Sequence, residues 1–196
     1  ECLNYFQKYL NLFQKRSASK KSNEKIISQN IFDKHLVFDR EQTQMFIAFN
    51  GYHLQAKENL YLKILTAHLS GQGSDLFVEV RDRQGLCYAV QPVHFAGLSG
   101  GYWGIYIGAG HGKEQLAASA ILGILEKLAS DGLSELEFTR TLKMIKGNHQ
   151  LSLQTNDDYA NAYTIPTLQG LGVDYTHQNQ NALMAVKLED LNKFLK

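Results

Sequence analysis

Apolar residues recur every three or four positions in several stretches of the chain, a spacing that predicts amphipathic helices. In the first of them, residues 2–16, the stripe consists of Leu3, Phe6, Leu10 and Phe13. The same spacing predicts helices over 57–70, 113–130, 134–149 and 157–170, a short helical piece over 74–82, and an amphipathic helix over the last ten residues, 187–196. The second half of the chain is therefore expected to be mainly helical.

Other stretches alternate apolar and polar residues, which predicts strands. They cover residues 31–39, 45–52, 86–93 and 101–110. The last two flank a Gly/Ser-rich turn at 97–101 and read as a hairpin. Strands joined by a hairpin, with helices grouped after them, indicate an α+β fold: a mainly antiparallel sheet with helices packed on one face.

Residues at the ends of the predicted helices fix two of the boundaries. Ser134 followed by Glu137 matches a capping box, and Gly132 just before it provides a helix stop. Gly71 and Gly73 precede the short helical piece. They lack the GKS or GKT ending of a phosphate-binding loop, so a sharp turn between two helices is the favoured interpretation.

Length and composition exclude several classes of protein. A chain of 196 residues with 44% hydrophobic content is long enough for one buried core. We expect one domain over 31–196, preceded by a linker helix and polar loop over 1–30. Lys and Arg number 20 against 19 Asp and Glu, so no overall positive field indicates nucleic acid. No apolar run reaches about 18 residues, so no membrane span is expected.

The candidate metal ligands do not form a pattern. The histidines stand singly, at positions 35, 53, 68, 94, 111, 149 and 177. HxxEH, HExxH and CxxC are all missing, so no metal site is expected in this chain. His149 lies on an apolar stripe and is expected in the core, and Cys87 in an apolar strand is expected to be buried and structural. Two cysteines leave the compartment open, cytoplasm or periplasm in a bacterium.

One pair of side chains suggests chemistry. In VRDRQGLCYAV, Arg81 closes the short helical piece, and Tyr88 follows early in a strand. A turn at Gln84–Gly85 would bring both side chains toward one end of the sheet. A guanidinium and a phenol could together hold a peptide carbonyl or an oxyanion developing on it. The residues alone also allow a structural alternative, in which Arg81 pairs with Asp82 or Glu79 and Tyr88 packs in the sheet.

At these residues the chain resembles a known family. The run LTAHLSGQGSDLFVEVRDRQGLCYAV is similar to the signature of the non-catalytic repeats in pitrilysin/insulinase zinc peptidases, which include the mitochondrial processing peptidase. The order of segments in such repeats is kept from about Phe32 onward. REQTQMFIAFNGY lies upstream of this run, and GYWGIYIGAG and LASDGLSELEFTRTLKMIKGNH lie downstream of it. Gln72 interrupts the small residues of the loop, and the final helix is shorter than usual. With Glu1 as first residue, these departures lead us to expect a fragment.

The resemblance implies a divided active site. In such proteins zinc and the general-base glutamate belong to an HxxEH repeat, in the same polypeptide or in a separate subunit. This chain would be the substrate-binding, metal-free C-terminal domain of a zinc metalloendopeptidase, inactive alone. Arg81 and Tyr88 would hold the backbone of an unstructured peptide near the scissile bond. Two alternatives remain open: a scaffold or assembly subunit of the same fold without peptidase activity, as in respiratory complexes, and an autonomous peptide-binding module.

Overall fold

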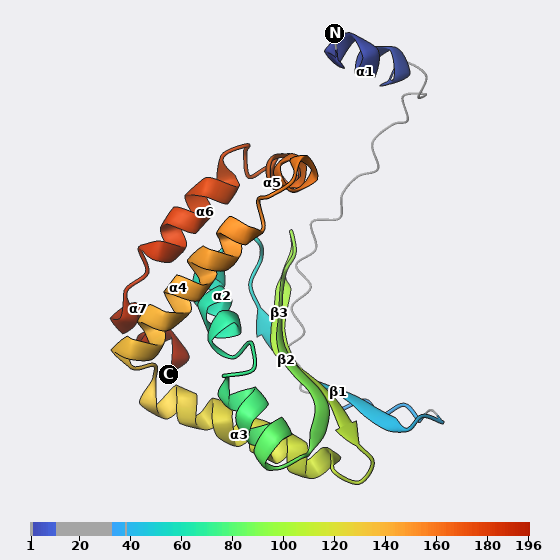
Figure 1. The fold of residues 1–196 in the computed structure, drawn as a ribbon, viewed down its shortest axis with the longest axis vertical. Helices are drawn as coiled ribbons and strands as arrows, with labels where there is room; N and C mark the ends of the chain where they lie inside the picture. Colours follow the sequence, from blue (N-terminus) through green and yellow to red (C-terminus); the bar gives the residue numbers. More distant parts are fainter. Residues whose placement is uncertain (1, 11–32, 38) are drawn as a thin grey trace.

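The computed structural model describes residues 2–10, 33–37 and 39–196 (Figure 1). Its elements follow in the order α1 (Cys2–Leu10), β1 (Gln42–Gly51), α2 (Glu58–His68), the π-helix η1 (Leu76–Arg83), β2 (Cys87–Ala96), β3 (Gly101–Gly110), α3 (Glu114–Asp131), α4 (Glu135–Leu151), α5 (Asn156–Leu168), α6 (Tyr175–Met184) and α7 (Leu188–Leu195). Among the described residues, no helix combines the length and apolar character needed to cross a membrane.

The three strands form an antiparallel sheet in the order β1-β3-β2, with β3 in the centre. β2 and β3 are joined by the predicted hairpin. Gly101 at the start of β3 is required by a close approach of backbone, since a Cβ there would lie 2.3 Å from the carbonyl oxygen of Phe95. The central strand carries the best-buried residues of the sheet, among them Ile105 and Ile107.

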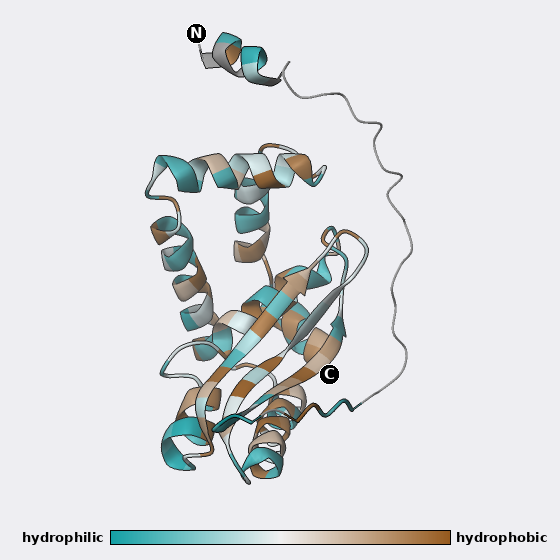
Figure 2. Ribbon diagram, turned by 90° about the vertical axis from the view of Figure 1, so that its right-hand side faces the viewer, coloured by the Kyte–Doolittle hydropathy of each residue, from teal (hydrophilic) through white to brown (hydrophobic). Residues whose placement is uncertain are grey.

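Helices cover one face of this sheet, as the sequence predicted (Figures 1 and 2). A first hydrophobic cluster joins that face to α2, η1 and α3 through fully buried residues such as Val80, Ile105 and Ile121. A second cluster, built around Ile64 and Phe138, packs α4, α6 and α7 behind α2. The fold is therefore α+β with an antiparallel sheet, and no helix among the described residues packs on the opposite face of the sheet.

Most of the predicted elements are confirmed within a few residues. The capping box is present: the Ser134 backbone N–H donates to a Glu137 carboxylate oxygen at 2.8 Å, and the Glu137 N–H donates to the Ser134 hydroxyl at 3.3 Å. α3 ends at Gly132, whose φ of 71° favours glycine. The segment with Gly71 and Gly73 is the turn between α2 and η1, as expected.

Three expectations are wrong or incomplete. Residues 33–37 form no strand and are exposed, because β1 pairs with β3 alone and the segment finds no strand partner; 31, 32 and 38 lie outside the described residues. His149 is half-buried, not part of the core. Helix α6 was not predicted, since its sequence is polar and only Leu183 is buried. The first helix is confirmed over Cys2–Leu10, and the rest of its predicted range, 11–16, lies outside the described residues together with the polar loop.

Candidate functional site

The site is built around the turn that connects η1 to β2. Three backbone hydrogen bonds close this turn. The N–H of Gln84 donates to the Glu79 carbonyl at 3.1 Å, that of Gly85 to the Arg81 carbonyl at 3.1 Å, and that of Leu86 to the Val80 carbonyl at 3.0 Å. Gly85 has a φ of +58°, which a side chain would disfavour. Arg81 and Tyr88 therefore stand on either side of a turn with a fixed backbone.

Arg81 is exposed, and an aromatic ring supports its guanidinium. The guanidinium carbon lies 4.6 Å from the centre of the Phe77 ring, one turn earlier in η1. Glu79 instead forms an ion pair with Arg83. Of the two acidic partners that the structural alternative offered to Arg81, Asp82 and Glu79, the second is thus engaged by Arg83, and Arg81 itself lies over Phe77. The spacing of Phe77 and Arg81, four residues apart in a helix, was the signal in the sequence that could have revealed this contact.

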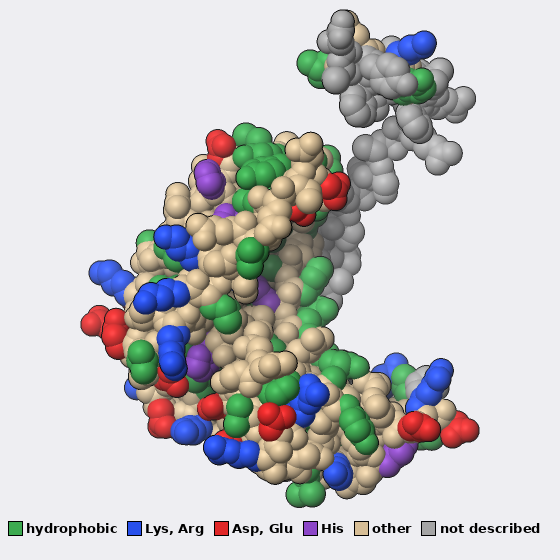
Figure 3. Space-filling view, viewed as in Figure 1, with side chains coloured by type: hydrophobic (Ala, Val, Ile, Leu, Met, Phe, Trp, Pro, Cys, Tyr) green, Lys and Arg blue, Asp and Glu red, His purple; other side chains and the backbone are tan. Residues whose placement is uncertain are grey.

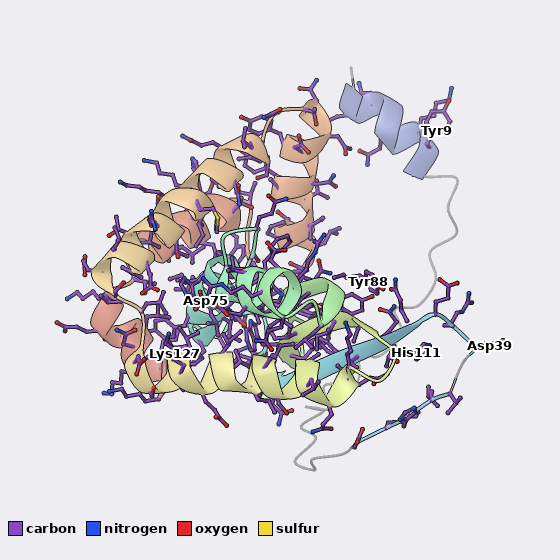
Figure 4. The ribbon with its side chains drawn as sticks, turned by 60° about the horizontal axis from the view of Figure 1, so that its bottom comes forward. Tyr9, Asp39, Asp75, Tyr88, His111 and Lys127 are labelled. Carbon is purple, nitrogen blue, oxygen red and sulfur yellow. The ribbon has the colours of Figure 1, made fainter. Side chains whose placement is uncertain are left out.

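Tyr88 does not pack in the sheet, because the ladder is interrupted where it stands. Cys87 pairs with Ala109 and Ala89 with Gly108, so Tyr88 is the extra residue of a β-bulge. A bulge re-aims the side chain that it carries. The Tyr88 ring is accordingly 65% exposed, and Figure 4 shows it at the edge of the molecule near η1. The hydroxyl is thus available to a second molecule.

The neighbouring Cys87 is buried, as predicted. Burial raises the pKa of its thiol, and the positive charge of Arg81 opposes this shift only in part. The thiol of Cys87 is therefore protonated at neutral pH.

A lysine from another helix holds the turn from outside. The Lys113 ammonium donates to the carbonyl oxygen of Gly85 at 2.8 Å. Lys113 is the residue immediately before α3, and 28 positions separate it from Gly85. No local pattern in the sequence could have predicted this contact, because it depends on how α3 crosses the end of the sheet.

Comparison with known proteins identifies the family of this chain. The model of the family described as "Peptidase M16 inactive domain" matches residues 1–145. The chain belongs to that family. The resemblance seen in the sequence, to a non-catalytic repeat of zinc peptidases, is thereby confirmed.

Individual relatives agree with this assignment. The M16 inactive domain is 29% identical over 120 residues to the uncharacterized zinc protease YmxG of Bacillus subtilis, covering 61% of the chain and 29% of that protein. Its fold matches a protease from Helicobacter pylori with a TM-score of 0.72 and 17% identity, over 81% of this chain and 38% of the other. It also matches a chain of Complex III2 from Candida albicans, with a TM-score of 0.69 and 14% identity over 80% and 40%. The chain thus spans less than half of each.

The described residues of this M16 inactive domain do not fit a zinc ion. A catalytic zinc takes three protein ligands. Among the described residues, no group of three or more His, Cys, Asp or Glu is placed to share a metal. His111 and Glu114 approach each other to 3.9 Å, but Thr43 and the carbonyl of Arg40 are their other partners. The relatives named as zinc proteases place zinc in the family, and no step of chemistry in this chain is assigned to it.

Proposed function

We propose that this M16 inactive domain is the substrate-binding C-terminal repeat of a zinc endopeptidase, and that Arg81 and Tyr88 hold the substrate. We place the repeat at 31–196, with 1–30 as a linker. The observation that carries the proposal is the presentation of both side chains. One is exposed over an aromatic ring and the other is exposed on a bulge, at the two ends of a single closed turn.

The two groups suit the backbone of an extended peptide. A guanidinium offers a planar fork of donors, and a phenol offers one more. Donors aimed at a carbonyl oxygen strengthen as negative charge develops there, so they stabilise the transition state more than the bound substrate. Because both donors address main-chain oxygen, the proposal fits unstructured peptides of varied sequence. The water-activating zinc would belong to the other repeat.

The proposal requires a partner that carries HxxEH. That repeat would lie in the same polypeptide or in a second subunit. The matched region covers 29% of the length of YmxG, which leaves room for such a repeat in a protein of that size. Alone, the chain would bind peptide weakly and hydrolyse nothing.

A peptidase assay tests the proposal. The complete protein, or this chain mixed with its HxxEH partner, is compared with Arg81→Ala and Tyr88→Phe variants. Turnover is expected to fall by roughly 100-fold or more, the usual effect of removing a transition-state donor. Arg83→Ala and Tyr163→Phe are matched controls, an exposed arginine of the same helix and an exposed tyrosine of α5. Wild-type turnover in both the Arg81→Ala and the Tyr88→Phe variant would rule out the proposed role of these two side chains.

A second candidate is a scaffold or assembly subunit without peptidase activity. The similarity of fold to a chain of Complex III2 supports it. Under this alternative Arg81 and Tyr88 have no substrate, and their variants alter neither activity nor assembly. The sequence that accompanies the chain separates the two candidates: an HxxEH about one domain away supports the peptidase, and its absence supports the scaffold.

A further inference from the structure

Two basic side chains lie together between α2, β2 and α6, and their partners are neutral. The Lys63 ammonium of α2 donates to the side-chain oxygen of Asn179 of α6 at 2.7 Å. Nε2 of His94 in β2 lies 3.1 Å from the side-chain oxygen of Asn59, one turn before Lys63 in α2. Burial, and then the charge of Lys63, lower the pKa of His94, so the two basic groups are close enough to repel each other. We call these four residues the basic cluster.

The basic cluster lacks a counter-charge within the described part of the chain. The ion pairs formed there involve neither Lys63 nor His94. Burial lowers the pKa of the half-buried Lys63, and no nearby carboxylate counters this shift. An ammonium carries three donors, of which Asn179 accepts one. A cation withdrawn from water in this way is costly unless a further acceptor completes its surroundings.

Asn59 determines which nitrogen of His94 carries the hydrogen. The side-chain amide of Asn59 donates to the carbonyl oxygens of His53 at 2.8 Å and Leu54 at 3.4 Å, which leaves its oxygen for His94. That oxygen only accepts, so Nε2 must be the protonated nitrogen. Nδ1 of His94 has no hydrogen-bond partner among the described residues, and it becomes a second donor when the ring is protonated.

A cavity of about 250 Å³ opens beside the basic cluster, between α2 and α6. Asn59 and Asn179 belong to its lining, so the cavity adjoins both basic groups. Its apolar walls include Leu60 and Leu171, and Lys57 is its one charged residue. The volume corresponds to roughly eight water molecules. The cavity therefore has room for one side chain next to the two basic groups.

We propose that the basic cluster binds the C-terminal carboxylate of a peptide, whose last side chain occupies this cavity. Lys63 and a protonated His94 offer charge-assisted hydrogen bonds to a carboxylate, and the two asparagines hold both groups in place. Apolar walls beside the cations favour a carboxylate that is attached to an apolar side chain. An inorganic phosphate or a small acid would leave those walls unused.

The position of the basic cluster fits a peptide that lies along β2. His94 and Tyr88 are six residues apart on this strand, which is about 20 Å in an extended chain. In Figure 3 the depression between α5 and the sheet shows hydrophobic and histidine side chains, and the Asp and Glu side chains of this view lie outside it. A carboxylate that enters from this face therefore meets no acidic group there. Binding at the basic cluster requires neither Arg81 nor Tyr88, so this proposal does not rest on their roles.

Calorimetric titration of the complete protein tests the proposal. The probes are N-acetyl-Gly-Gly-Leu with a free carboxylate, the same tripeptide as its C-terminal amide, and acetate. The free acid is expected to bind at least about 10-fold more tightly than the other two, since the amide has no charge and acetate has no apolar side chain. Equal affinity for acid and amide overturns the carboxylate site. Equal affinity for acetate and the tripeptide acid overturns the assignment to a peptide.

Substitutions locate the bound probe. Lys63→Met keeps the length of the side chain and should weaken binding of the acid at least about 10-fold, the loss of one hydrogen bond to a charged group. Lys63→Arg should recover most of the affinity, and Lys143→Met, on an exposed part of α4, should lose none. Urea unfolding checks that each variant is folded. Wild-type binding in Lys63→Met overturns the assignment.

Proton uptake on binding gives a readout that a purely structural His94 would not affect. A bound carboxylate favours the imidazolium, so the affinity should rise between pH 7.5 and 5.5, where the peptide carboxylate stays ionised. The charged group that acts on this ring is Lys63 of α2. Titrations in buffers of different ionisation enthalpy measure the uptake, which His94→Gln should abolish and His177→Gln, on exposed α6, should retain. Unchanged uptake in His94→Gln overturns the role of His94.

This proposal and the proposed function can fail separately. Arg81→Ala should bind the tripeptide acid like the wild-type protein, whatever its turnover. Turnover that ignores Arg81→Ala, together with acid binding that depends on Lys63, removes the proposed function and keeps the carboxylate site. Turnover that falls in Arg81→Ala, together with acid binding that ignores Lys63→Met, does the reverse.

Discussion

The ammonium of Lys113 donates a 2.8 Å hydrogen bond to the carbonyl of Gly85, which fastens the start of α3 to the turn between Arg81 and Tyr88. We predict that Lys113→Met lowers kcat/KM of the assembled peptidase by roughly 3- to 10-fold, the equivalent of one hydrogen bond of about 1 kcal/mol. The contact is exposed, so the free energy of unfolding should change by less than about 1 kcal/mol. Kinetics and urea unfolding on the same preparations measure the two quantities.

Conservative replacement separates this positioning role from a general effect of charge. Lys113→Arg keeps a donor and should recover most of the activity, while Lys143→Met, an exposed lysine of α4, should lose none. Equal losses in the arginine and methionine variants would show that the hydrogen bond to Gly85 is irrelevant.

The indole of Trp103 depends on one hydroxyl of α2. Its N–H donates to the Thr66 hydroxyl at 3.0 Å, and Trp103 is 4% exposed. Thr66→Val leaves this donor unsatisfied inside the core and should cost about 1–3 kcal/mol of unfolding free energy. Trp103 is the single tryptophan of the chain, so its fluorescence reports the transition directly.

Thr167→Val is the matched control for that variant. The Thr66 hydroxyl donates to the carbonyl of Leu62, one helical turn earlier, at 2.7 Å, and the Thr167 hydroxyl donates in the same way to the carbonyl of Tyr163 at 2.7 Å, but on an exposed surface. Its replacement should change stability by less than about 0.5 kcal/mol. A similar cost in both variants would mean that the Trp103 contact adds nothing beyond the local helix effect.

The capping box of α4 makes the free energy of unfolding depend on pH in the acid range. The hydroxyl and then the backbone N–H of Ser134 lower the pKa of Glu137 below its usual value. Stability from this carboxylate is therefore present above its unfolded pKa, near 4.3, and is lost as the pH falls through the lower folded pKa. Ser134→Ala should cost about 1 kcal/mol at pH 7 and flatten the acid limb of the unfolding curve. Ser130→Ala in α3 should leave that limb unchanged.

His94 acts in the same direction as Glu137, but in a higher pH window. Burial, and then the charge of Lys63, lower the pKa of this imidazole, whose Nε2 lies 3.1 Å from the Asn59 side-chain oxygen. Below about pH 6.5 the unfolded chain binds a proton that the folded chain does not, so stability falls as the pH falls toward the folded pKa. The slope can reach about 1.4 kcal/mol per pH unit. Urea unfolding at pH 7.5 and 5.5 should show a smaller loss for His94→Gln than for wild type.

The exposed His177 supplies the comparison for that experiment. His177→Gln should retain the wild-type loss of stability between the two pH values. If His94→Gln and wild type lose stability equally, the imidazole of His94 is not the group that titrates.

Much of the fold could be predicted because its signals are local. The stripe on α3, the stop at Gly132 and the Ser134–Glu137 box each act within one or two helical turns. The segment 33–37 alternates like a strand but forms none, since a strand exists only through a partner that the local pattern does not reveal. Helix α6 was missed for the related reason that its position depends on packing against α4 and α5, not on an apolar stripe.

The position of the candidate site could be predicted from local sequence, but the contacts of its side chains could not. The spacing of Arg81 and Tyr88 across Gly85 identified the turn. The ion pair of Glu79 with Arg83 and the stacking of Arg81 on Phe77 both follow the four-residue spacing of a helix, but that spacing does not say which partner within reach each side chain takes. The bulge at Tyr88 could not be read at all, because it arises from the register between β2 and β3.

The order β1-β3-β2 has a consequence for the domain when it is handled apart from the rest of its protein. β1 and β2 are the outer strands among the residues that the structure describes, and β2 weakens its outer edge with Pro92, which has no N–H to offer. β1 has no such defence: QTQMFIAFNG contains neither proline nor charge over ten residues. An edge of this kind recruits strands from other molecules and promotes aggregation. A lysine at Thr43 or Gln44 would be the first change to make in a domain intended to stay monomeric at high concentration.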